Sequence, residues 1–62
     1  MKPNELIKFL EDQDLTNLAF AEILGVSKEA VDHWVMGRRA IPDTTAKLIR
    51  LFGRRPELMK EL

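Results

Sequence analysis

The stretch from residue 15 to 42 constrains the fold most, because two short apolar patterns of helical period meet there at a glycine-containing turn. Thr16 and Ser27 are good N-cap residues; Gly25 follows the first pattern, where a left-handed backbone is often needed, and Gly37 ends the second. We therefore predict one helix between Thr16 and Gly25 and a second between Ser27 and Gly37.

The rest of the chain shows the same helical period, and no segment alternates apolar and polar residues as a half-buried strand would. We expect one helix at about 3–12, one that opens at Pro42 and Asp43 and stops at Gly53, and a last one with Pro56 in its first turn. The prediction is an all-α, compact five-helix domain spanning residues 1–62. The residues expected to point inward are Leu6, Phe9, Leu10, Phe20, Ala21, Leu24, Val31, Trp34, Val35, Leu48, Leu51 and Phe52.

Small side chains are expected where the two central helices cross. Ala21 should let the backbone of the second helix approach the first, and Val26 should plug the space beneath the turn. Trp34 falls on the apolar stripe with Val31, so we assign it to the core and not to base stacking.

Composition argues against several classes of function. The chain has no Cys and a single His, His33, so it offers neither a disulfide nor a Cys-based zinc site. It also lacks Tyr, and a domain of 62 residues rarely builds a substrate pocket, so we expect no enzymatic activity, no cofactor, no metal and no small-molecule ligand. No apolar run approaches the ~20 residues of a membrane span, and we expect a soluble, cytoplasmic protein with no membrane partner.

The net charge is zero, yet the charges are unevenly distributed. Residues 27–55 carry seven Lys or Arg against three Asp or Glu, whereas residues 1–26 carry two against five. A basic face on a neutral protein can still bind phosphate, with weaker non-specific affinity than a basic protein has.

The pattern L-T-x-x-x-F-A-x-x-L-G-V-S-x-x-x-V-x-x-W-x-x-G-x-R-x-I-P, residues 15–42, resembles the Cro/repressor helix-turn-helix family, also called the XRE type. The resemblance is close over residues 15–52 and looser over the whole chain. It implies a lambda-repressor-like DNA-binding domain whose helix-turn-helix, at about 16–36, is formed by the second and third helices. The end of the chain, from Ile41 on, has a weaker similarity to the helix-turn-helix domain of some antitoxins.

In this family the exposed face of the third helix contacts base edges in the major groove. The resemblance places these contacts at Lys28, Glu29, Asp32 and His33. Lys28 would donate to guanine, whereas Glu29 or Asp32 would accept from cytosine.

The two acids are a departure, because each repels the phosphates. The alternative is that Asp32 pairs with Lys28 at i, i+4, that Glu29 complements the helix dipole, and that His33 is simply solvated.

Phosphate contacts have a separate set of candidates. Asn17 matches a phosphate-binding position of the family at the start of the second helix, and Arg38 and Arg39 follow the third helix in a loop beside the groove. The alternative for the arginine pair is a solvated loop. Arg54 and Arg55 lie farther along and would only complement the negative end of the fourth helix. The further phosphate candidates are Thr16, Ser27, Thr44, Thr45 and Lys47.

The resemblance implies a homodimer on a pseudo-palindromic operator, and the expected dimer interface is Phe52, Leu58, Met59 and Leu62. The leading hypothesis is a small repressor or autoregulator of phage, plasmid or bacterial type that binds double-stranded DNA and is regulated by its own concentration. The second is an antitoxin-like protein-interaction module that has lost DNA affinity.

Three apolar residues, Ile7, Leu18 and Ile23, stand where the family commonly has polar ones. They either extend the core towards the last helix or form a patch for another protein. Leu10 and Val35 replace a buried Arg–Glu pair that is common in the family, and we expect an apolar contact there.

Overall fold

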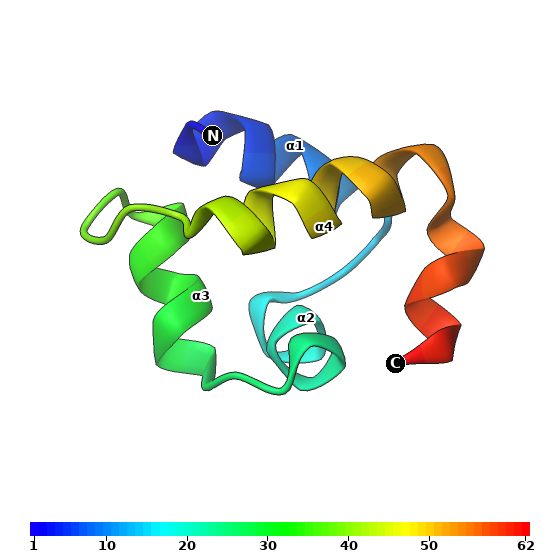
Figure 1. The fold of residues 1–62 in the computed structure, drawn as a ribbon. Coiled ribbons are helices and arrows are strands. Elements are labelled where there is room, and N and C mark those ends of the chain that lie inside the picture. Colours follow the sequence, from blue (N-terminus) through cyan, green and yellow to red (C-terminus); the bar gives the residue numbers. More distant parts are fainter.

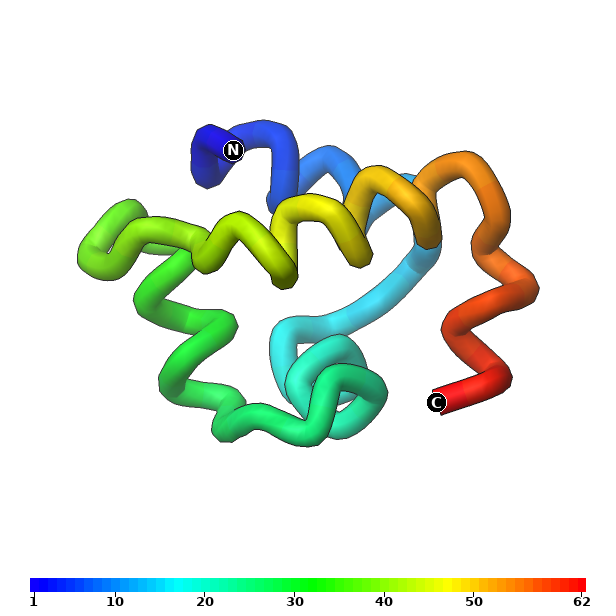
Figure 2. The backbone as a smooth tube through the Cα atoms, in the orientation of Figure 1, coloured from blue at the N-terminus to red at the C-terminus, as the bar shows by residue number.

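The computed structural model describes all 62 residues and contains five helices and no strand, which confirms the all-α prediction. The α-helices are α1 (Pro3–Asp12), α2 (Asn17–Leu24), α3 (Lys28–Val35) and α4 (Asp43–Arg54), and a 3₁₀ helix, η1, spans Pro56–Glu61. In Figure 1, α1 and α4 run side by side above α2 and α3, and η1 descends from the end of α4. Figure 2 shows the chain ends on different sides of the molecule. None of the helices combines the length and the apolar character needed to cross a membrane.

The turn between α2 and α3 forms as its sequence predicts. Thr16 Oγ1 accepts a hydrogen bond from the Ala19 N–H at 3.0 Å, and Ser27 Oγ accepts from the Ala30 N–H at 3.2 Å, so each side chain caps its helix. Gly25 has φ +74°, the left-handed conformation in which glycine avoids the steric penalty of a Cβ atom.

One apolar core holds the four α-helices together. The ring centroids of Phe9 in α1 and Phe20 in α2 lie 5.4 Å apart. The ring planes are inclined by 60°, which is a favourable tilted arrangement. Ala21 is 1% exposed where α2 packs against α3, as expected of a small residue at the crossing. The buried residues are Leu6, Phe9, Leu10, Phe20, Ala21, Val31, Trp34, Ile41, Ala46, Ile49 and Phe52, with Leu24 and Val35 half-buried against them.

The predicted inner face of α4 is partly wrong. Leu48 is 37% exposed, whereas Ala46 and Ile49 are buried together with Phe52. Spacing of three residues puts 46, 49 and 52 on one stripe, while Leu48 lies about a ninth of a turn outside the edge of that stripe. The helix therefore presents a face rotated from the one that its leucines suggested, and Leu51 is only half-buried.

The predicted stop of α4 at Gly53 is also wrong. The helix continues to Arg54, and the Arg55 N–H donates to the Leu51 carbonyl at 2.8 Å. Gly53 lacks a positive φ, so it does not terminate α4 in a left-handed conformation. It lies over α1, where an added Cβ would contact the ring of Phe9 at 4.0 Å.

Val26 does not plug the space beneath the turn, because it is 40% exposed. Its N–H closes the turn by donating to the Ala21 carbonyl at 3.0 Å, so the backbone is engaged while much of the side chain stays in solvent. Of the three unusual apolar residues, Ile7 and Leu18 are exposed and Ile23 is half-buried, and none belongs to the core cluster. Leu10 is in the core and Val35 packs against the core cluster, which is consistent with the expected apolar environment.

Candidate nucleic-acid interface

Helix α3 is divided into an attached face and a free face. Val31 and Trp34 are buried and fix the helix to the rest of the molecule. The four residues proposed to contact bases lie away from that stripe, Lys28 and Glu29 exposed and Asp32 and His33 half-buried. The attached face thus holds α3 in place while polar groups remain on its other side.

A single carboxylate joins the beginnings of α2 and α3. Asp32 Oδ1 accepts a hydrogen bond from Asn17 Nδ2 at 2.9 Å, and Asp32 Oδ2 lies 2.8 Å from Lys28 Nζ. Asn17 is the first residue of α2 and Lys28 the first of α3. The pairing of Asp32 with Lys28 is the alternative that the sequence offered to base contacts at these residues, and it is present, whereas the bond to Asn17, fifteen residues away, has no local signal in the sequence.

These contacts shift the acidity of both charged groups. The hydrogen bond from Lys28, and then that from Asn17, hold the pKa of Asp32 below its ordinary value of 3.8. The hydrogen bond to Asp32 raises the pKa of Lys28 above its ordinary value of 10.5. Asp32 is therefore ionised and Lys28 protonated near neutral pH.

The loop after α3 begins with a fixed turn that carries two arginines. The His33 carbonyl accepts hydrogen bonds from the Arg38 N–H at 2.9 Å and the Arg39 N–H at 3.3 Å. Gly37, at φ +75°, makes this turn beside Pro3 of α1, whose Cγ a Cβ on the glycine would approach to 3.6 Å. Both arginine side chains are exposed and take part in none of the three ion pairs of the chain.

The hydroxyl candidates have mixed surroundings. Thr16 and Ser27 use their oxygens as helix caps, yet each hydroxyl keeps its O–H to donate to an anion. Thr44 and Lys47 are exposed on α4, and Thr45 is half-buried. The structure thus brings Asn17, Lys28 and Asp32 into direct contact, while no hydrogen bond or ion pair links Arg38, Arg39, Thr44 or Lys47 to them.

The expected dimer interface needs one correction. Phe52 is 2% exposed and belongs to the core of the monomer, so it is not available to a partner. Leu58 and Met59 of η1 pack half-buried against the core, and Leu62 is 67% exposed. Phe52 was also expected to point inward from its helix, and its burial on α4 agrees with that expectation.

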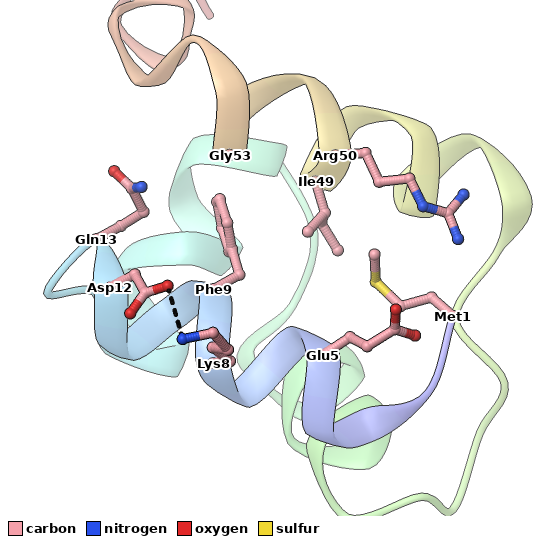
Figure 3. A pocket seen from close by; sticks show the side chains of 9 residues that line it. All are labelled: Met1, Glu5, Lys8, Phe9, Asp12, Gln13, Ile49, Arg50 and Gly53. Atoms are coloured by element: carbon pink, nitrogen blue, oxygen red, sulfur yellow. Dashed lines mark ion pairs between the residues drawn. The ribbon is translucent and has the colours of Figure 1, made fainter.

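An open pocket lies elsewhere, between α1 and α4 (Figure 3), and none of the proposed DNA contacts lines it. Phe9 and Ile49 supply apolar surface to the pocket. Lys8 and Asp12 also line it and form an ion pair, with Lys8 Nζ 3.5 Å from Asp12 Oδ2. Six of its nine lining residues are not hydrophobic, unlike the apolar clefts that typically bind small molecules.

Compared with known proteins, the chain matches no protein-family model and no curated protein sequence.

Proposed function

We propose that this protein is a sequence-specific regulator of transcription that binds double-stranded DNA with a helix-turn-helix of the Cro/repressor type. In this proposal α2 lies across the DNA backbone and α3 enters the major groove. A small repressor or autoregulator, acting as a dimer on a pseudo-palindromic operator, is the form that best suits such a module.

The observation that carries the proposal is the division of α3. Val31 and Trp34 attach one side of the helix to the core, and the residues free to meet base edges are Lys28, Glu29, Asp32 and His33. The short turn, with left-handed Gly25 and the Ser27 cap, supports an angled pair of helices that can insert one member into a groove.

Groups suited to phosphate flank this face. Arg38 and Arg39 are exposed, free of ion pairs and directly connected to the end of α3. Asn17 begins α2, where free backbone N–H groups favour an anion. Together they supply local positive potential even though the net charge of the chain is zero.

The dimer part of the proposal rests on the end of the chain. Leu62 is largely exposed and follows the half-buried Leu58 and Met59 on η1, so apolar surface is present there. Half-sites should then lie about one helical turn apart on the DNA. A protein that stays monomeric both in solution and on a palindromic site would contradict this part.

Selection from a pool of randomised duplexes tests the proposal. The wild type should enrich a defined, pseudo-palindromic sequence, and Lys28→Ala or Glu29→Ala should lose preference at particular base positions while keeping the rest. Arg54→Ala, at the far end of α4, serves as the control and should select the same sequence. If neither groove-facing variant altered the preference at any position, the base-reading assignment would be wrong.

The competing function is a protein-interaction module without DNA affinity. One observation favours it: Asp32 already engages both Asn17 and Lys28, which removes two DNA contacts from the free surface. No enrichment from the pool at any salt concentration would support the interaction module instead.

A further inference from the structure

Asp32 accepts hydrogen bonds from Asn17 and Lys28, two of the residues that the proposed function assigns to DNA contacts. Its two oxygens lie 2.9 Å from Asn17 Nδ2 and 2.8 Å from Lys28 Nζ, and these two residues open α2 and α3. A phosphate or a base acceptor would need the same amide and the same ammonium. The carboxylate thus occupies, from within the chain, the position of a DNA acceptor.

The contacts are reversible and partly solvated. The side chains of Lys28 and Asp32 are 50% and 26% exposed, so water and ligands reach the pair. An ammonium has three N–H donors and an amide has two, so Asp32 leaves some donors free. Its one negative charge offsets the positive charge of Lys28, so the pair presents no net charge to a phosphate.

We propose, on the basis of the proposed function, that Asp32 is a specificity-determining residue that competes with DNA for Asn17 and Lys28 and weakens binding to non-cognate duplexes more than binding to the operator. Non-specific binding depends almost entirely on phosphate electrostatics, so the neutralisation of Lys28 by the carboxylate of Asp32 acts on it in full. At the operator, a base-edge donor such as cytosine N4 compensates the carboxylate, whereas a non-cognate sequence leaves it uncompensated.

The test compares Asp32→Asn with wild type on the selected operator and on a random duplex. Asparagine keeps one oxygen to accept from Asn17, and it puts an uncharged NH2 donor in place of the oxygen that faces Lys28. Binding to the random duplex should tighten about tenfold near 0.1 M salt, with a salt slope steeper by about one, because Lys28 becomes free to contact a phosphate. Operator affinity should tighten less than that, because the variant also weakens the contact of residue 32 with its base-edge donor, so the ratio between operator and random duplex narrows.

Two further variants isolate the cause. Glu22→Gln removes an equal charge from the exposed surface of α2 at a residue outside every proposed contact, and it should leave the specificity ratio unchanged. In a Lys28→Met background, the gain from Asp32→Asn should shrink, because no ammonium is released.

The outcomes separate this inference from the proposed function. If wild type binds a selected operator and Asp32→Asn leaves the ratio unchanged or widens it, the competition by Asp32 is refuted and the function stands. If neither protein binds any duplex, both are refuted. If only Asp32→Asn binds, the competition is supported in its strongest form. Circular dichroism of each variant confirms that it remains folded.

Discussion

At the scale of single residues, two glycines have opposite effects on the backbone. Gly25 ends α2 in the left-handed region, at φ +74°, whereas Gly53 lies inside α4 and has no positive φ. Their neighbours in the sequence look similar, since both follow an apolar helical stripe. Their packing differs as well: Gly53 lies against Phe9 of α1, and nothing lies within 4 Å of a Cβ built on Gly25.

Alanine substitution should therefore have opposite effects at the two sites. Gly25→Ala should lower the free energy of unfolding by about 1 kcal/mol, because a Cβ atom is strained at a positive φ. Gly53→Ala should raise it by about 0.5–1 kcal/mol, because alanine favours a helix interior and its methyl group would only touch Phe9. Urea denaturation of both variants measures this difference, and a loss of stability at Gly53 equal to that at Gly25 would contradict the assignment.

Asp32 gives the chain a pH dependence of predictable sign. Its pKa is lower in the folded protein than its ordinary 3.8, because of Lys28 and Asn17, so its contribution to stability is complete above that value and is lost as the pH falls through the lower one. In Lys28→Met the pKa of Asp32 should rise towards 3.8. Carboxyl NMR titration measures this, with Lys8→Met on α1 as the control. An unchanged pKa in Lys28→Met would mean that the pair is absent in solution.

At the scale of elements, local signals predicted α2 and α3 and failed on the inner face and the last residues of α4. The caps of α2 and α3 depend on residues three apart, Thr16 with Ala19 and Ser27 with Ala30, so the sequence itself contains the information. The inner face of α4 depends on how that helix rotates against α1. Leu48 and Ile49 are adjacent in the sequence and both are apolar, so hydrophobicity alone cannot decide which of them is buried.

The contact between α2 and α3 depends on the small size of Ala21. Ala21→Leu should lower the free energy of unfolding by about 1–3 kcal/mol, because the site is 1% exposed and cannot hold three more carbons without displacing the residues packed around it. Ala19→Leu, at a half-buried position of the same helix, should cost clearly less. Thermal denaturation compares the two variants. An equal cost would show that α2 and α3 are not closely packed at Ala21.

At the scale of the whole molecule, the charge is balanced overall but the arginines after α3 are free of ion pairs. The sequence predicted which residues of α3 are buried and which are not, because helical period determines the face of the helix on which each residue lies. It did not predict that Asp32 would bridge Asn17 and Lys28, since that contact requires two helices to meet in space. Phe52 was expected both to point inward and to meet a dimer partner, and its burial within its own chain decides for the first.

The salt dependence of DNA binding tests the central claim most directly. The logarithm of the association constant for the selected duplex should fall steeply and linearly with the logarithm of salt concentration, and Arg38→Ala with Arg39→Ala should flatten that slope by about 1.8, for two lost phosphate contacts. The matched control, Arg54→Ala with Arg55→Ala, removes the same charge at the end of α4 and should leave the slope nearly unchanged. If both double variants flattened the slope equally, or if binding of the wild type did not depend on salt, the proposed phosphate contacts of Arg38 and Arg39 would be contradicted.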